Sequence, residues 1–172
     1  MIQRIQTLYL LLAAIALIAC LCLPIGLYVS AEGDVVATLY NLWAHIPPQM
    51  GDALHGNPDA PLLAADAEGS HIFTPWALMA LLILTAMGQL FAIFIYKARL
   101  MQSRLAMLTA LLLIGWYAVY ALMGTMLAAR FEAAFRPTVA AALPAISAIL
   151  AYLAFRAILK DEALVRSLDR LR

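Results

Sequence analysis

Four long apolar runs, separated by short polar connections, dominate the chain. They cover residues 5–29, 73–96, 105–127 and 138–159. Each run holds 22 to 25 residues, and a helix needs about 20 residues, rising about 1.5 Å each, to cross a hydrocarbon core of roughly 30 Å. Because backbone amides in lipid must be satisfied within the segment, all four runs are predicted to be transmembrane helices. The connections 97–104 and 128–137 are short, which favours antiparallel neighbours in one domain, an all-α four-helix transmembrane bundle.

Prolines mark several expected helix boundaries. Thr74 is predicted to cap the second span with Pro75 in its first turn, and Pro137 is expected to do the same for the fourth span. Pro24 and Pro144 lie inside the first and fourth spans, where each predicts a kink or an early helix end.

The distribution of charge predicts the orientation. Nine of the eleven basic residues lie on one side of the spans: Arg4, Lys97, Arg99, Arg104, Arg156, Lys160, Arg166, Arg170 and Arg172. The other side holds Arg130 and Arg136 together with seven of the ten acidic residues. Because short cytoplasmic segments are enriched in Lys and Arg, both termini are predicted to be cytoplasmic, with the loop 30–72 on the outer side of the membrane.

The loop 30–72 contains one apolar segment, residues 35–46, with two interpretations. As a helix it places Leu39, Trp43 and Ile46 on one face, which suits an interfacial helix. As a strand, its β-branched residues and Tyr40 favour a β-hairpin with residues 71–73. The sequence leaves both open.

The tail 160–172 is predicted to be a short amphipathic helix that continues the fourth span, with Leu164, Leu168 and Leu171 on one face. One interpretation is a charged end that fixes the topology and contacts lipid phosphates; the other is a docking site for a partner protein. The residues expected to contact a membrane or cytosolic partner are Arg99, Arg104, Lys160, Asp161, Glu162, Arg166, Asp169 and Arg170.

Three cytoplasmic segments together resemble a known family. They are MIQRIQTLYLLL (1–12), YKAR (96–99) with QSRL (102–105), and KDEALVRSLDRLR (160–172). The chain resembles, over its whole length, an uncharacterised family of four-span inner-membrane proteins of Bacteroidota, a domain of unknown function. The resemblance implies a class and a location but no activity, and it implies that family members share the cytoplasmic face.

Composition and motifs exclude several classes of function. With 66% hydrophobic and 12% charged residues the chain is unlike a soluble domain, and a net charge of +1 without a basic stripe argues against nucleic-acid binding. There is no Gly-rich phosphate loop, no CxxC and no Ser-His-Asp spacing, so no enzyme, catalytic residue or cofactor is expected. Cys20 and Cys22 diverge on a helix and are expected to act as apolar filler. Residues 17–20 resemble a lipoprotein cleavage site, but the apolar run continues beyond Cys20, which favours an uncleaved span.

Histidines and acids in the loop 30–72 suggest a metal site only weakly. His55 and Asp59 stand four residues apart, but Gly56, Asn57 and Pro58 between them disfavour the helix that would align them. No metal is therefore expected. Transport is also disfavoured, because no span carries an ionisable group at its midplane.

Polar aromatic and amide side chains inside the spans have two interpretations. They are Gln89, Trp116, Tyr117, Tyr120 and Tyr152. Gln89 and Tyr152 lie at matching depths and are expected to bond each other as interhelical contacts, whereas the functional interpretation is a pocket for a lipid-like or quinone-like molecule. A stripe of small residues on the fourth span (Ala140, Pro144, Ser147, Ala151 and Ala154) predicts close helix packing, within the bundle or against another protein.

Two functional hypotheses follow. The first is a non-enzymatic accessory or assembly factor that acts through its cytoplasmic face. The second is a binder or carrier of a lipid-like molecule within the bundle. The sequence does not decide the oligomeric state.

Overall fold

The computed structural model describes residues 3–46, 71–73, 76–95 and 98–169 of the chain. It is mostly helical, with four long helices and a small antiparallel sheet. The chain forms two compact units, and each is described by itself. The helical unit comprises Met1–Ala19, Ala80–Tyr117 and Ala142–Arg172, and the sheet unit comprises Cys20–Met79 and Ala118–Ala141.

The four long helices are α1 (Gln3–Cys22), α3 (Ala77–Phe94), α4 (Arg99–Phe131) and α5 (Leu143–Asp169). Each is long and apolar enough to cross a membrane, which confirms the four predicted apolar helices and suggests a membrane protein. Their bounds differ from the prediction at several ends. In particular, α5 runs on through residue 169, so the expected helical continuation of the fourth span into the tail is confirmed that far.

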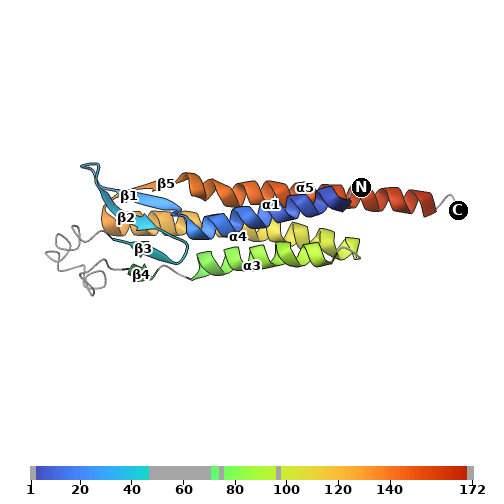
Figure 1. Cartoon of the computed structure of the whole chain (residues 1–172). Coiled ribbons are helices and arrows are strands. Elements are labelled where there is room, and N and C mark those ends of the chain that lie inside the picture. The colour runs from blue at the N-terminus through green and yellow to red at the C-terminus, as the bar shows by residue number, and fades with distance from the viewer. Residues whose placement is uncertain (1–2, 47–70, 74–75, 96–97, 170–172) are drawn as a thin grey trace. The chain divides into compact units, whose positions relative to one another are not determined.

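All four helices meet in the helical unit, where they run side by side (Figure 1). One buried layer takes a single residue from each helix: Leu10, Ala92, Ala106 and Ala154. Three of the four are alanines, and such small side chains let helix backbones approach closely, which drives packing in lipid. The four-helix arrangement predicted from the sequence is therefore present in this unit.

The interior of the helical unit is more polar than its outer face. Among the described side chains, seven polar ones are buried there: Gln6, Thr85, Gln89, Gln102, Ser103, Thr109 and Ser147. The outer face instead exposes large apolar side chains, such as Ile15 on α1, Met87 on α3 and Ile114 on α4. In water such a distribution would leave much apolar surface exposed, so it favours a lipid environment for these helices.

Within the described residues of the sheet unit there are five strands, which Figure 1 shows next to one another. They are β1 (Gly26–Val29), β2 (Val35–Leu39), β3 (Trp43–His45), β4 (His71–Phe73) and β5 (Ala134–Pro137). The order is β4-β3-β2-β1-β5, and every pairing is antiparallel. At the tight turn between β1 and β2, Gly33 adopts a φ of 96°, a conformation that favours glycine.

Two of these strands correct the sequence prediction. Residues 26–29 were expected to end the first span, but α1 ends at Cys22 ahead of Pro24 and the chain then enters β1. Residues 134–137 were expected to be a plain connection with Pro137 near a helix start, but they form β5 against β1. The fourth span instead begins with a 3-10 turn, η1 (Val139–Ala142), and Pro144 lies in the first turn of α5, where it produces no kink within the helix.

For residues 35–46 the structure selects strands over the interfacial helix. Residues 71–73 do form a strand, as that interpretation expected, but their partner differs. β4 pairs with β3, so that Trp43 lies opposite Phe73, while β2 pairs with β1 and β3. The caps predicted at Thr74 and Pro75, and residues 47–70, lie outside the described residues.

An aromatic cluster holds the sheet to the end of α4 that belongs to the sheet unit. Tyr28 of β1 packs against Phe131 and Phe135, with ring centroids 5.4 and 5.1 Å apart, and Tyr120 meets Phe135 at 5.5 Å. Burial raises the pKa of the Tyr28 phenol, with a further contribution from Tyr120, so the hydroxyl stays neutral in the folded protein.

Hydrogen bonds to backbone carbonyls fix the segment between α1 and β1. The hydroxyl of Tyr120 donates to the carbonyl of Ile25 at 2.7 Å, and the backbone N–H of Thr138 donates to the same carbonyl at 3.2 Å. The Nδ2 of Asn41 donates to the carbonyl of Cys20 at 2.8 Å, which satisfies one of the last carbonyls of α1.

Candidate functional site

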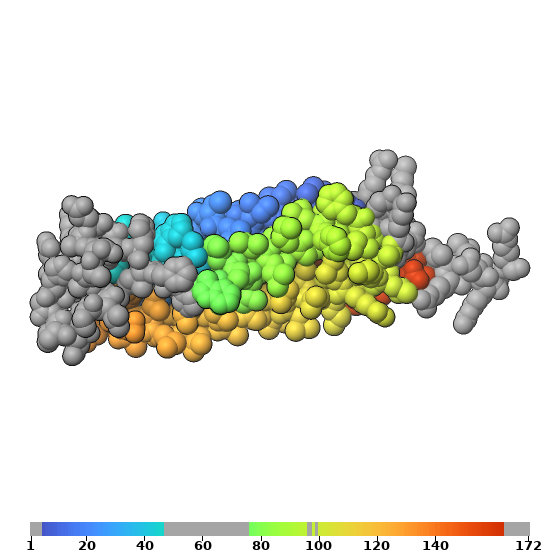
Figure 2. All heavy atoms as spheres, turned by 90° about the horizontal axis from the view of Figure 1, so that it is seen from below, coloured from blue at the N-terminus to red at the C-terminus, as the bar shows by residue number. Residues whose placement is uncertain are grey.

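A groove of about 810 Å³ opens on the helical unit and is the candidate site. Six apolar residues line it: Phe91 of α3, Ala98 of the α3–α4 turn, and Leu100, Met101, Leu105 and Leu108 of α4. Two charged residues complete the lining, Arg104 of α4 and Glu162 of α5. Figure 2 shows the face of the molecule on which α3 (green) lies alongside α4 (yellow).

Two contacts locate the groove at one end of the helical unit. The side chain of Gln6, close to the start of α1, donates a hydrogen bond to the carboxylate of Asp161 in the last third of α5. The carbonyl of Ala98 accepts the N–H groups of Met101 and Gln102, which starts α4. The beginning of α1, the end of α3, the beginning of α4 and the end of α5 therefore meet here, and we call this the basic end.

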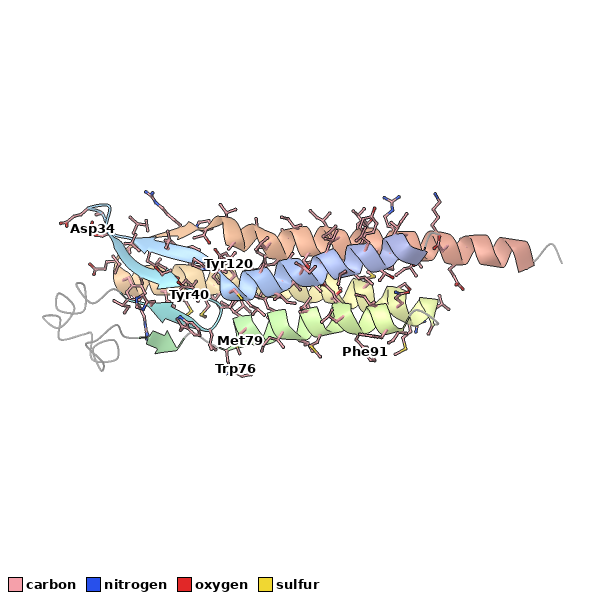
Figure 3. The ribbon with its side chains drawn as sticks, in the orientation of Figure 1. Asp34, Tyr40, Trp76, Met79, Phe91 and Tyr120 are labelled. Atoms are coloured by element: carbon pink, nitrogen blue, oxygen red, sulfur yellow. The ribbon has the colours of Figure 1, made fainter. Side chains whose placement is uncertain are left out.

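The local sequence explains how the lining forms. On α4, the residues at 100, 101, 104, 105 and 108 recur at spacings of one helical turn and so share one face. Leu105 is partly buried and packs against the four-helix layer, which makes it the floor of the groove. Phe91, Leu100, Met101 and Leu108 are exposed around it, and Figure 3 shows Phe91 on the outer side of α3.

Charge gives the groove a bipolar character. Arg104 is exposed and Glu162 is half-buried, and both belong to the same lining. The N-terminus of α4 lies beside them and adds the positive end of a helix dipole. The lining offers charged binding groups and an apolar surface, and none of its eight residues is a serine, cysteine or histidine nucleophile. The arrangement suits the binding of an amphiphile.

Of the eight residues predicted to contact a partner, the structure brings Arg104 and Glu162 to the groove. Asp161 is engaged by Gln6, and Lys160 is exposed on α5. For Arg99, Arg166 and Asp169 the structure describes the helical backbone and not the side chains, and Arg170 lies outside the described residues.

The five polar residues of the spans lie in different surroundings and do not form one site. Gln89 does not bond Tyr152 as expected: its Nε2 donates to the Oγ of Ser147 at 2.9 Å, and Tyr152 is 54% exposed. Trp116 is fully buried and packs edge-on against Tyr117, with ring centroids 5.0 Å apart. Tyr120 belongs to the aromatic cluster of the sheet unit. None of the five lines the groove.

The small-residue stripe of α5 faces its own bundle. Ser147, Ala151 and Ala154 are fully buried, Ser147 bonds Gln89 of α3, and Ala154 belongs to the four-helix layer. The sequence had left an outward-facing stripe open, and these contacts settle it for that part of α5.

The histidines of the loop are only partly described. The strand register places His45 of β3 opposite His71 of β4, and His55 lies outside the described residues. Two residues are fewer than the three or four protein ligands that a zinc site uses. Among the described residues no group of three or more His, Cys, Asp or Glu side chains lies close enough to hold a metal ion.

Sequence reasoning missed the apolar part of the groove. Arg104 and Glu162 were predicted as partner contacts, but Phe91, Leu100, Met101 and Leu108 look like ordinary lipid-facing positions. For Leu100 and Leu108 a signal does exist, because their spacing with Arg104 at i, i+4 and i+8 places a cation within an apolar stripe.

Comparison with known proteins adds a family. The model of the family described as "Domain of unknown function (DUF4293)" matches residues 2–171, nearly the whole chain. No curated protein matches the chain.

Proposed function

The chain belongs to the DUF4293 family, a domain of unknown function, and on that premise we propose that it is a non-enzymatic accessory or assembly factor of the inner membrane. In this proposal it is a four-span protein of Bacteroidota with both termini in the cytoplasm, and it acts on a membrane or cytosolic protein through its cytoplasmic face. In this role it binds the partner protein and catalyses no reaction.

The observation that carries the proposal is the concentration of binding groups at the basic end. Nine of eleven Lys and Arg residues lie on the side of the spans that includes this end, and the groove opens there with Arg104 and Glu162 in its lining. The helix α5 continues to Asp169, beyond the apolar window that ends at Ala163, which gives a partner a charged helical segment to contact.

Orientation is tested first by cysteine labelling. In a background with Cys20→Ala and Cys22→Ala, single cysteines replace Asp59 or Asp169, and intact cells are treated with a membrane-impermeant maleimide. The proposal expects labelling of the cysteine at 59 in intact cells and labelling of the cysteine at 169 only after permeabilisation. The reverse pattern would refute the cytoplasmic orientation.

The partner is tested by charge reversal on the tail. Arg166→Glu with Arg170→Glu is expected to reduce the amount of protein that co-purifies with the full-length chain in mild detergent by about tenfold, since two exposed ion pairs, each worth about 0.7 kcal/mol, are lost. The matched control is Arg130→Glu with Arg136→Glu, which changes the net charge equally on the other side. Equal loss, or no loss, in both pairs contradicts a role for the tail, provided the labelling test shows an unchanged topology.

A second candidate function is the binding of a lipid-like or quinone-like molecule, and the apolar lining of the groove favours it. Native mass spectrometry of protein purified in mild detergent is expected to show a retained amphiphile in the wild type. A spectrum of bare protein under conditions that preserve other membrane protein–lipid complexes would remove this candidate.

A further inference from the structure

We propose that the groove binds a zwitterionic aminophospholipid, whose headgroup carries a phosphate and a primary ammonium group. The phosphate contacts Arg104, the ammonium group contacts Glu162, and an acyl chain lies along Phe91 and Leu108. This inference rests on the second candidate function and names the class of its ligand.

The order of the groups along the helices matches such a lipid. Ala92, Ala106 and Ala154 lie in one layer, so positions on α4 and α5 can be measured from it at about 1.5 Å per residue. Arg104 lies about 3 Å from the layer toward the basic end, and Glu162 lies about 12 Å from it in the same direction. Leu108 lies about 3 Å on the other side of the layer. From the membrane outward, the groove therefore presents the apolar Leu108, then the cation of Arg104 and then the anion of Glu162. The apolar Met101 and Leu100 of α4 lie at depths between the two charges.

A phospholipid has the complementary sequence of groups. Its acyl chains lie deepest, its phosphate comes next, and in an aminophospholipid the ammonium group extends farthest toward water. The long Arg104 side chain can extend outward to the phosphate, as basic side chains near a membrane surface do. The two sites are therefore compatible with one headgroup that lies along the helix axis.

The chemistry of the two side chains gives class selectivity. A guanidinium group binds phosphate oxygens through two parallel N–H donors, and the positive end of α4 adds to that attraction. A carboxylate has several lone-pair sites and accepts N–H donors from a primary ammonium group. A phosphatidylcholine headgroup has no N–H donor, and a phosphatidylglycerol headgroup has no cation, so each satisfies Arg104 and leaves Glu162 without that contact.

The apolar lining explains why the site takes a whole lipid. Phe91 and Leu108 are each more than half exposed, and Leu105 forms a floor fixed to the four-helix layer. An acyl chain placed on this floor covers both side chains, while the headgroup reaches the charges. A free phosphate or a soluble amine would use only part of the groove.

The test uses the full chain, purified, delipidated and titrated with three lipids of equal chain length. These are phosphatidylethanolamine, phosphatidylcholine and phosphatidylglycerol, and binding is read by native mass spectrometry. The wild type is expected to bind phosphatidylethanolamine about tenfold more tightly than the other two, the size of one charge-assisted contact. Size-exclusion chromatography verifies that each protein remains folded.

Two variants separate the contacts. Glu162→Gln is expected to abolish the preference for phosphatidylethanolamine while binding to phosphatidylcholine stays unchanged. Arg104→Gln is expected to weaken the binding of all three lipids by about tenfold, because each has a phosphate. The matched controls are Glu32→Gln and Arg130→Gln, exposed residues of the sheet unit that are expected to change nothing.

A charge swap distinguishes lipid binding from a simple ion pair. If Arg104 and Glu162 served only each other, Arg104→Glu with Glu162→Arg would restore wild-type behaviour. The proposal expects the swapped protein to remain folded and to lose the preference for phosphatidylethanolamine.

Several outcomes overturn the proposal. Equal binding of the three lipids by the wild type refutes the headgroup assignment while leaving lipid binding itself in place. No binding of any lipid removes the second candidate function as well. If substitutions in the groove leave lipid binding unchanged but reduce the amount of a co-purifying protein, the groove is a binding site for that protein.

Discussion

The two units of this chain are stabilised in different ways. In the helical unit small residues and polar side chains are buried between helices together with some large ones such as Trp116 and Leu113, and many other large apolar residues face outward. The sheet unit instead buries an aromatic cluster and pairs its backbone across the described strands. The first arrangement suits a solvent of hydrocarbon, in which apolar burial between helices is not favoured and close packing and hydrogen bonds replace it. The second is that of an ordinary antiparallel sheet with a buried face.

The comparison predicts that the two units tolerate amino-acid substitutions at different positions. A charged residue introduced on the outer face of the helical unit is expected to be destabilising. A charged residue introduced at an exposed position of the sheet unit is expected to be tolerated. Interior positions of the sheet unit should be more sensitive than interior positions of the helical unit, because aromatic packing leaves less freedom than small residues with local hydrogen bonds.

The largest effect is expected for a charge on the outer face of α4. Ile114 is 67% exposed near the middle of the predicted span, and an arginine at a helix centre costs about 2.5–3.5 kcal/mol for insertion into a membrane. Ile114→Arg is therefore expected to lower the membrane-inserted fraction, measured by fractionation and thermal stability in detergent. Val35→Arg, at an exposed position of β2, is the control and should insert normally. Equal tolerance at both positions would contradict the comparison.

The next effect concerns the two glycines on either side of Phe135. A Cβ on Gly26 would overlap Cε2 of Phe135, and one on Gly124 would lie 2.8 Å from its Cε1. The ring cannot move away from one glycine without approaching the other, so Gly26→Ala and Gly124→Ala are each expected to destabilise the sheet unit by about 1–3 kcal/mol.

Thermal unfolding with and without Phe135→Leu measures this effect. The smaller side chain should restore part of the lost stability in either alanine variant, which a double-mutant comparison detects. Gly115→Ala is the control, because nothing lies within 4 Å of its added Cβ and alanine favours a helix. Additive losses would show that Phe135 is not the cause.

A smaller effect is expected for Tyr120→Phe. The substitution removes the hydrogen bond to the carbonyl of Ile25, but that carbonyl keeps the N–H of Thr138, so no buried acceptor is orphaned. The expected loss is about 1 kcal/mol in chemical or thermal unfolding. Tyr152→Phe, at an exposed position of α5, should cause no measurable change, and a comparable loss there would contradict the assignment.

The smallest effect is expected inside the helical unit. A double-mutant cycle of Gln89→Leu and Ser147→Ala should yield a coupling energy of about 0.6 kcal/mol, typical of interhelical hydrogen bonds in membranes. The cycle of Gln89→Leu with Thr85→Val should give a value near zero, because the Thr85 hydroxyl donates to the carbonyl of Leu81 within its own helix. A coupling as large as the aromatic effects would contradict the difference between the two units.

The candidate site was only partly accessible to sequence reasoning. Charge alone singled out Arg104 and Glu162, because charged residues next to apolar spans stand out. Phe91 and Met101 carried no such signal, since on any one transmembrane helix an apolar residue that lines a groove looks like one that faces lipid. Likewise, Gln89 was recognised as an interhelical contact, but its partner Ser147 depends on how α3 and α5 are rotated.

The sequence by itself determined the four apolar helices, the continuation of the last one, and the concentration of basic residues on one side, because these depend on composition within one segment. Tertiary structure alone decided that residues 26–29 and 134–137 are strands. They are separated by more than a hundred residues, so their pairing is a long-range contact, and a strand of four residues has little local signal of its own. It also decided which apolar residues surround Arg104 and Glu162, since a groove arises only when α3, α4 and α5 pack against one another.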